Sequence, residues 1–350
     1  MPPWKARLLG LSERLFALAR RYPGTIAAFG FVSGLASFFL VDRHEGFARS
    51  VAVLMLVSWV WLMLENALRS KVERWFGFTL PPPLLRYATQ LIHQESLFFA
   101  LPFFATTTSW NSGQAAFTGL LGVAALVSIT DPLYYGRLAE RRWLYLSYHT
   151  LTLFAVLLAA LPVILQTPTP LSYELALGVA VLLSFPSIAG SLPMPRWWRG
   201  VLLVLLMAAL AGAGWWLRLW VPPATLWLNE VAVTVRVDDA SKAPGESLRA
   251  LGAAELKAQG LYAYTAVNAP LGLQERIWHV WMHDGAEVDR IAIDIRGGRK
   301  EGYRAWTHKQ NFPAQPVGRW QVKVLTDAGQ MIGTLRFRVT ADDVPGAVRQ

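Results

Sequence analysis

Cysteine is absent from the 350 residues of the sequence, and charged side chains are scarce. Without cysteine the chain holds no disulfide, no thiolate zinc site, no iron–sulfur cluster and no cysteine nucleophile. Charged residues make up 16% of the sequence and hydrophobic residues 54%, whereas a soluble domain carries about 25% charged residues. This composition predicts that a large part of the chain lies in a lipid bilayer.

Sequence motifs of common enzymes are also missing. The sequence contains no Walker A loop, G-x-S-x-G elbow, H-E-x-x-H pair or dinucleotide-binding glycine pattern. The net charge is +10, but residues 226–350 hold 16 Lys and Arg against 14 Asp and Glu. A nearly neutral polar part has no basic surplus for phosphates, so nucleic-acid binding is disfavoured. The sequence favours a protein that is not an enzyme, and it indicates no cofactor and no metal.

Hydrophobic runs fill residues 24–221 and predict a polytopic helical membrane domain. One crossing needs about 20 apolar residues. Seven stretches meet this requirement: 24–41, 50–68, 88–108, 114–130, 147–165, 173–191 and 200–221. Residues 1–23 place leucines at helical spacing among five basic residues, which predicts an amphipathic helix on the cytoplasmic membrane surface. Two prolines after the last run predict a linker at 222–227.

The loops of this region alternate in charge. Basic residues occur before residue 24, at 69–86, at 137–142 and at 196–199. The alternate loops contain Arg43 and Arg49 in the first, and none in "SWNSG" and "QTPTPLS". Since basic loops stay in the cytoplasm, the N-terminus is expected there. Seven crossings then place the C-terminal part on the opposite side of the membrane.

A different pattern, the alternation of apolar and polar residues, begins near residue 228 and continues to 341. Alternation with period two predicts strands. It occurs in seven stretches: 226–237, 261–267, 276–283, 287–295, 303–309, 319–326 and 331–339. Seven short strands predict an all-β sandwich of immunoglobulin-like size, followed by a tail at 342–350. The predicted fold is therefore a bundle of about seven transmembrane helices plus this sandwich.

Four motifs follow one another in the C-terminal part: "IWHVWMHDGAEV", "YRAWTHKQNFP", "GRWQVKVLTDAGQMIG" and "FRV". Over residues 260–340 the chain resembles a family of bacterial inner-membrane proteins of unknown function, whose C-terminal module is a small β domain with this Trp-His and Gly-x-Trp pattern. The resemblance implies a multi-pass inner-membrane protein with a periplasmic β module. It implies no activity, substrate or catalytic residue.

Polar residues interrupt the apolar runs near their predicted cytoplasmic ends. They are Glu65, Asn66, His93, Glu95, Asp131 and His149. Ionisable groups within a bilayer usually face a cavity or one another, so these side chains could converge in one layer. A carboxylate–histidine group could bind a cation, relay a proton or act as a general acid–base pair. The alternative is that several lie at the membrane surface and pair with basic loop residues.

The stretch "RIWHVWMHDG" offers a second candidate site. His279 and His283 share one strand face but lie about 13 Å apart, too far to bind one zinc ion at about 2 Å from each nitrogen. The aromatic residues here therefore either fill the sandwich core or form an exposed edge for a ligand. The candidate binding surface comprises His279, Trp281, His283, Arg299, Arg304 and His308.

Two functions remain. The leading hypothesis is a non-enzymatic inner-membrane protein whose periplasmic β-sandwich binds an envelope partner, either protein or glycan. The alternative is a membrane transporter or membrane-embedded enzyme that uses the polar cluster in the cytoplasmic half of the bundle. A structural assembly factor is a third reading.

Overall fold

The computed structural model describes residues 82–191 and 196–341, with five isolated positions before residue 82. The predicted helix 1–23 and tail 342–350 lie outside the described residues, as do Glu65 and Asn66 and nearly all of the predicted spans 24–41 and 50–68. The chain divides into two compact units. The described residues of one unit form helices. The other joins the β region to residues 104–118, 161–178 and 205–226 at the helix ends.

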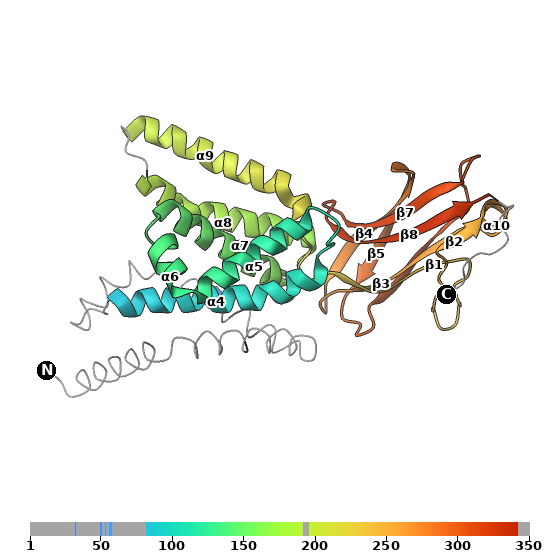
Figure 1. Ribbon diagram of the computed structural model, residues 1–350, viewed down its shortest axis with the longest axis horizontal. Coiled ribbons are helices and arrows are strands. Elements are labelled where there is room, and N and C mark those ends of the chain that lie inside the picture. Colours follow the sequence, from blue (N-terminus) through green and yellow to red (C-terminus); the bar gives the residue numbers. More distant parts are fainter. Residues whose placement is uncertain are drawn as a thin grey trace. The chain divides into compact units, whose positions relative to one another are not determined.

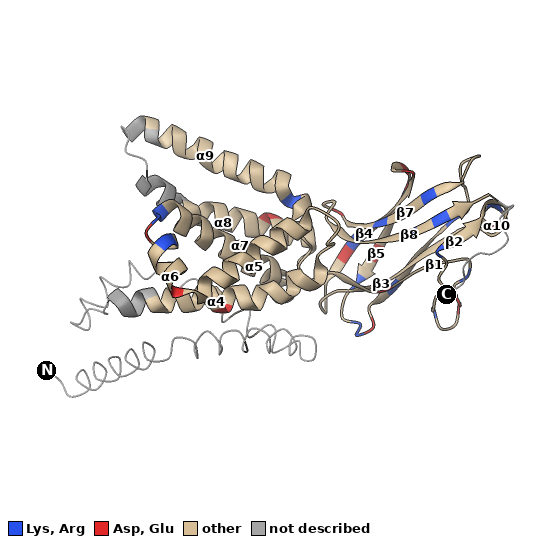
Figure 2. Ribbon diagram, viewed as in Figure 1, with Lys and Arg blue, Asp and Glu red and all other residues tan. Residues whose placement is uncertain are grey.

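Helices rich in leucine and alanine occupy most of residues 82–220 (Figure 1). They are α4 (Pro82–Thr107), α5 (Gln114–Ile129), the short α6 (Asp131–Leu133) with a π-helix (Tyr134–Leu138), α7 (Arg142–Leu165), α8 (Thr169–Ser191) and α9 (Arg196–Trp216), which a 3-10 turn (Leu217–Trp220) extends. Figure 2 shows that charged residues lie mainly at or beyond the helix ends.

The prediction of about seven membrane-spanning helices is wrong. In the described part of the chain, two helical stretches are long and apolar enough to cross a membrane, Arg142–Leu165 and Gly200–Trp220. A third candidate combines α5 with Asp131–Leu138, but this pair bends by 99°. The structure therefore supports two or three candidate spans in this part of the chain.

Helix length, polar residues and a proline explain why fewer helices than predicted can cross a membrane. The helix α5 has 16 residues and is about 24 Å long at 1.5 Å per residue, short of a hydrocarbon core of about 30 Å. Pro132 follows Asp131 at the bend, where a proline cannot continue the helical hydrogen bonds. Polar residues such as Gln90, Gln94 and Glu95 lower the apolar content of α4.

The β region consists of two sheets. Its elements are β1 (Trp227–Thr234), β2 (Ala250–Gly252), α10 (Ala253–Gln259), β3 (Leu261–Asn268), β4 (Gln274–His283), β5 (Ala286–Arg296), β6 (Tyr303–Lys309), β7 (Gly318–Thr326) and β8 (Met331–Thr340). The strand orders are β1-β3-β6 and β2-β8-β7-β4-β5. All pairs are antiparallel except β2–β8. Each of the seven alternating stretches forms a strand, and β2 adds an eighth that the seven-strand prediction lacked.

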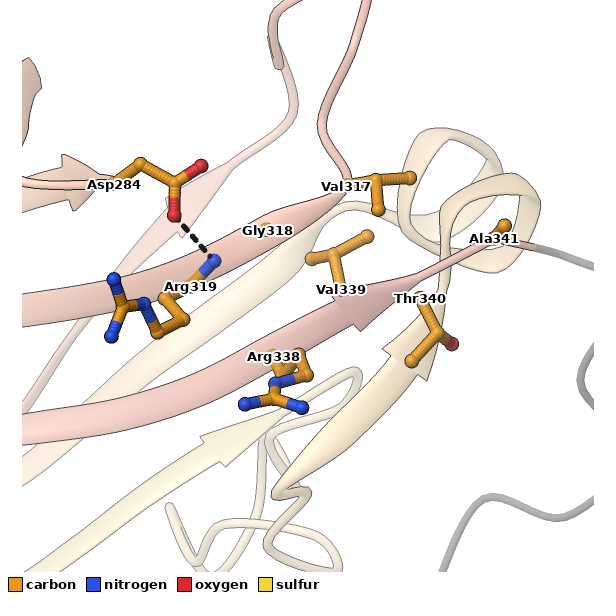
Figure 3. Close-up of a pocket in the computed structure, with 8 residues that line it drawn as sticks. All are labelled: Asp284, Val317, Gly318, Arg319, Arg338, Val339, Thr340 and Ala341. Carbon is orange, nitrogen blue, oxygen red and sulfur yellow. Dashed lines mark hydrogen bonds between the residues drawn. The ribbon is translucent and has the colours of Figure 1, made fainter.

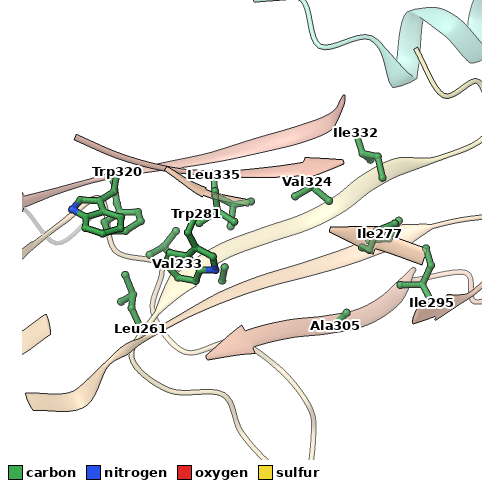
Figure 4. Close-up of a cluster of buried hydrophobic side chains, with 14 of the residues drawn as sticks. Val233, Leu261, Ile277, Trp281, Ile295, Ala305, Trp320, Val324, Ile332 and Leu335 are labelled. Carbon is green, nitrogen blue, oxygen red and sulfur yellow. The ribbon is translucent and has the colours of Figure 1, made fainter. Parts of the chain in front are cut away.

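One hydrophobic core draws side chains from both sheets (Figure 4). Trp281 on β4 and Trp320 on β7 are buried completely or nearly so, and both indoles lie close to the Phe337 ring. Alternation explains this arrangement, because every second residue of a strand faces the core. A chain without disulfides depends on such large apolar side chains for its stability.

Buried polar contacts tie the helix ends to the β region within the second unit. The side chains of residues 221–226, which include most of the predicted linker, are buried. The Gln330 amide donates to the Val221 carbonyl at 2.8 Å, and the Arg218 guanidinium donates to the Ala328 carbonyl at 3.1 Å. These contacts hold the end of the α9 segment against the β7–β8 turn.

Candidate functional site

A row of hydrogen-bonded side chains lies inside the helical unit. His93 on α4 is completely buried. Its Nδ1 atom is 2.8 Å from the Tyr134 hydroxyl, and its Nε2 atom is 2.9 Å from Nδ1 of His149 on α7. Tyr145 and Tyr148 place their rings beside this row. The π-helix supplies Tyr134, and such irregular turns are frequent at functional sites.

Asp131 joins the same region through an amide. The Gln90 side chain donates to the Asp131 carboxylate at 2.8 Å and to the Ser128 carbonyl at 3.0 Å, and it accepts a hydrogen bond from Tyr135. The structure thus brings together His93 and His149 and places Asp131 on an adjoining network. Glu95 lies on the same helix α4 and is partly buried.

The chemistry of this row is that of proton exchange. A neutral imidazole donates from one nitrogen and accepts at the other, so the row can shift its protons in either direction. No three His, Asp or Glu side chains of the described residues lie close enough to hold a metal ion. Sequence reading missed Gln90, Tyr134 and Tyr135, because tyrosine and glutamine are common in helices; the Asp131-Pro132 break was the available signal.

The predicted binding surface does not form one surface. His279 and Trp281 are completely buried. His279 on β4 bridges the two sheets, with Nε2 at 3.2 Å from the Thr265 hydroxyl and Nδ1 at 3.1 Å from the Thr307 hydroxyl. Burial lowers the pKa of His279 to about 4, so this ring is neutral at physiological pH. These two residues belong to the core.

The remaining residues of that candidate surface are dispersed. His283 stacks on Trp320 at 4.5 Å near the β4–β5 turn, and His308 stacks on Tyr262 at 3.9 Å. Arg304 donates to the Glu301 carboxylate and to the Ser241 carbonyl. Arg299 lies over the Tyr303 ring. Each side chain is engaged by its own neighbours.

A buried carboxyl group, Glu275, was also missed. Glu275 on β4 is 3% exposed and accepts a 2.6 Å hydrogen bond from the Thr169 amide in the first turn of α8. Its other oxygen has no hydrogen-bond partner among the described residues. Burial raises the pKa of Glu275 to about 7, and the Thr169 hydrogen bond only partly opposes this shift.

Strands β7 and β8 carry basic residues (blue in Figure 2), and their burial patterns place four cations on the outer face of the sheet. They are Arg319 and Lys323 on β7 and Arg336 and Arg338 on β8. The strand register places Arg319 opposite Arg338 and Gln321 opposite Arg336. None of the four side chains forms an ion pair or a hydrogen bond with another described residue. Like charges directly opposite each other destabilise a sheet, so fold stability does not explain this basic face.

A hollow of about 510 Å³ lies at one end of the basic face, beside Arg319 and Arg338 (Figure 3). Asp284 borders it, but its carboxylate accepts a 2.9 Å hydrogen bond from the Arg319 amide, and its own amide donates to the Arg319 carbonyl. The sequence signal for the face was present in "GRWQVKV" and "LRFRV", read with period two. Summing charges over the whole β region concealed it.

Comparison with known families covers nearly the whole chain. A family model described as a family of unknown function, DUF5924, matches residues 2–263, more than half of the chain. The chain belongs to this family. A second model, described as a protein of unknown function, DUF2914, matches residues 274–339. No curated protein and no solved structure matches the chain.

The two matches divide the candidate sites between them. The His93 row lies in the part matched by DUF5924, and the basic face and Glu275 lie in the part matched by DUF2914. The prediction of an uncharacterised family is confirmed. The membrane location and the bacterial origin stay predictions.

Proposed function

We propose that the protein is an integral protein of the bacterial inner membrane whose β region faces the periplasm and binds an anionic glycan of the envelope without catalysing a reaction. The observation that carries the binding part is the basic face of β7 and β8, whose four cations form no ion pair with a described carboxylate. The helices supply the membrane anchor.

The surface of α9 supports the membrane anchor. Apolar side chains are exposed along this helix, among them Val204 at 69% and Leu205 at 60%. Contiguous apolar surface of this kind is unfavourable in water and favourable against lipid tails. Trp215, Trp216 and Trp220 are exposed near its C-terminal end, where indole rings favour the membrane–water interface.

Basic residues support the orientation. The helix α7 begins beside Arg141 and Arg142, and α9 begins at Arg196. Both helices reach the β-containing unit at their other ends. Because basic helix ends stay in the cytoplasm, this arrangement supports the proposal of a periplasmic β region.

Single cysteines test this orientation, since the natural chain has none. Ser247→Cys in the β region is expected to react with a membrane-impermeant maleimide in intact cells whose outer membrane has been permeabilised. Ala139→Cys, next to the basic start of α7, is expected to react only after lysis. Both residues are exposed. Labelling of Ala139→Cys before Ser247→Cys would reverse the topology.

The composition of the basic face favours a glycan over a protein partner. Gln321 and Thr334 lie between the cations, so the face is polar throughout. The centres of protein interfaces are apolar and aromatic and contain few lysines. Guanidinium groups bind phosphate, sulfate and carboxylate groups well. A polyanionic glycan therefore matches this face better than a protein does.

The affinity of the full chain for dextran sulfate, with neutral dextran as reference, tests the binding proposal. Arg319→Gln/Arg338→Gln is expected to weaken dextran sulfate binding about tenfold or more, because two of four ionic contacts are lost. Arg236→Gln/Lys300→Gln removes the same charge from exposed positions outside β7 and β8 and is expected to have little effect. Equal weakening by both double variants would show that only net charge matters.

A second candidate function rests on the row Tyr134–His93–His149. Its hydrogen bonds of 2.8 and 2.9 Å form a continuous path between α4, the π-helix and α7. Such a path suits a transporter that moves protons together with a solute, or a membrane-embedded enzyme with an acid–base step.

Proton flux into liposomes that contain the full chain and a pH-sensitive dye tests this candidate. His93→Ala is expected to lower the flux at least about tenfold, because positioned proton-transfer groups contribute factors of this size or larger. His308→Ala, in the β region, serves as the control. Absence of flux in the wild type, or equal flux in both variants, would remove the candidate.

A further inference from the structure

A second hollow lies on the basic face, beside an exposed tryptophan. Its volume is about 330 Å³, near the lower end of the range of about 300–1,000 Å³ typical of small-ligand pockets. Strands β7 and β8 and the loop between α4 and α5 line it, with Trp110 and Asn111 from the loop and Gln321, Lys323 and Arg336 from the strands. All of these residues lie within one compact unit.

The loop that carries Trp110 is held in place by a buried amide. Gln114 is completely buried. Its Oε1 atom accepts a hydrogen bond from the Ser109 amide at 2.9 Å, and its Nε2 atom donates to the Met331 carbonyl on β8 at 2.9 Å. A side-chain amide that joins this loop to β8 fixes the position of Trp110 beside the strands.

Glycine at position 113 allows a second anchor of the loop. A Cβ atom at Gly113 would lie 3.1 Å from the Trp220 ring, so this contact leaves little room for a side chain. The loop is thus fixed on both sides, by Gln114 toward β8 and by Trp220 toward the end of α9. A binding site gains from such rigidity, since the ligand does not have to order the loop.

The side chains around the hollow combine three kinds of recognition. Trp110 is 61% exposed and offers an indole face. Arg336 and Lys323 form no ion pair with other described residues, and the Glu287 carboxylate acts on Lys323 only at longer range, so both cations can contact an anion. Asn111 and Gln321 offer amides that donate to and accept from hydroxyl groups. An aromatic face, two cations and two amides match a ligand with a flat ring, an anionic group and several hydroxyls.

We propose that this hollow binds a phosphorylated sugar, with its ring against Trp110, its phosphate on Lys323 and Arg336, and its hydroxyls on Asn111 and Gln321. The inference rests on the proposed function, because it names the ligand class at one end of the same basic face. A free sugar phosphate and the headgroup of a sugar-phosphate lipid share this chemistry.

Binding of glucose 1-phosphate, glucose and inorganic phosphate to the full chain in detergent micelles tests the assignment. Glucose 1-phosphate is expected to bind at least about tenfold more tightly than either glucose or inorganic phosphate. Trp110→Ala is expected to lower the affinity for glucose 1-phosphate about tenfold and to leave the affinity for inorganic phosphate unchanged. Trp110→Phe is expected to retain most of the affinity for glucose 1-phosphate. Trp143→Ala removes another exposed indole, at 66% exposure, and serves as the matched control.

A vesicle arm distinguishes the two sources of the ligand. Phosphatidylcholine vesicles with and without a prenyl-phosphate-linked glucose are compared for binding of the full chain reconstituted in nanodiscs. Trp110-dependent binding of free glucose 1-phosphate, or of the vesicles that carry the glucose lipid, supports the assignment, and the ligand that binds identifies the source. Equal affinity of wild type and Trp110→Ala for glucose 1-phosphate and for the glucose-lipid vesicles overturns the assignment.

The dextran sulfate measurement separates this inference from the proposed function. Arg319 and Arg338 do not line this hollow. If their double variant loses dextran sulfate affinity while Trp110→Ala changes nothing, the sugar-phosphate site is wrong and the basic face stands. If glucose 1-phosphate binds through Trp110 but dextran sulfate does not bind, the site stands and the wider glycan-binding function is wrong.

Discussion

Glu275→Gln is expected to abolish a loss of stability that the wild-type protein undergoes between about pH 4.5 and pH 7. The pKa of Glu275 rises from 4.5 to about 7 on folding, mainly through burial. A raised carboxyl pKa means that the unfolded chain releases its proton first as the pH increases. In this window the native state binds more protons than the unfolded state, so the free energy of unfolding falls with increasing pH.

The expected size follows from the shift of the pKa. At 1.36 kcal/mol for each pKa unit, the loss is about 3 kcal/mol across the window, and it is complete above pH 7. Glutamine keeps an acceptor for the Thr169 amide but does not ionise. The free energy of unfolding of the full chain in detergent, measured from pH 4 to pH 8, gives the result. Glu246→Gln, at an exposed position, is the control, and identical pH profiles for the two variants would contradict the expectation.

Trp281→Ala is expected to lower the free energy of unfolding of the β region by about 3–5 kcal/mol, the range for loss of a large buried side chain. Trp281 is completely buried between the two sheets, and its indole lies 6.3 Å from each of the Phe312 and Phe337 rings. Its Nε1 atom has no hydrogen-bond partner among the described residues, so the loss is one of packing.

Strand β4 provides the matched control for this substitution. Trp278 lies three positions earlier on the opposite face, partly exposed, with its Nε1 donating to Asp327 at 2.9 Å. Trp278→Ala is expected to lower the free energy of unfolding by about 1 kcal/mol, the typical value of one hydrogen bond. Denaturant unfolding of both variants gives the comparison. An effect of Trp278→Ala equal to that of Trp281→Ala would contradict the assignment of the two faces.

The strands were predictable because alternation is a local signal. The stretches that contain Trp281 and Trp320 each form a strand of the five-stranded sheet. The predicted strand began at Arg276, one residue too late to include Glu275, whose burial depends on Thr169, 106 positions away. The position of a single carboxyl group in the core depends on such distant contacts, which alternation does not report.

The helical part was harder to predict from apolar length. Polar residues within apolar runs indicated His93, Asp131 and His149. In the structure, Nε2 of His93 lies 2.9 Å from Nδ1 of His149. The same runs overstated the number of crossings, because an apolar window does not show where a helix bends. The helix α5 ends after 16 residues, and the chain bends by 99° at the break before Pro132. The basic face was missed because net charge was summed over too long a segment. In the sum over the whole β region, the basic residues of β7 and β8 are cancelled by acidic residues in the turns.

The salt dependence of dextran sulfate binding by the full chain tests the central claim most directly. If the basic face of β7 and β8 binds the polyanion, wild-type affinity falls steeply as salt increases, because ionic contacts release counterions and are screened over about 10 Å at 0.1 M salt. The variant Arg319→Gln/Arg338→Gln then shows weaker binding and a shallower dependence on salt. Equal affinity and equal salt dependence in the wild type and this variant would contradict the claim.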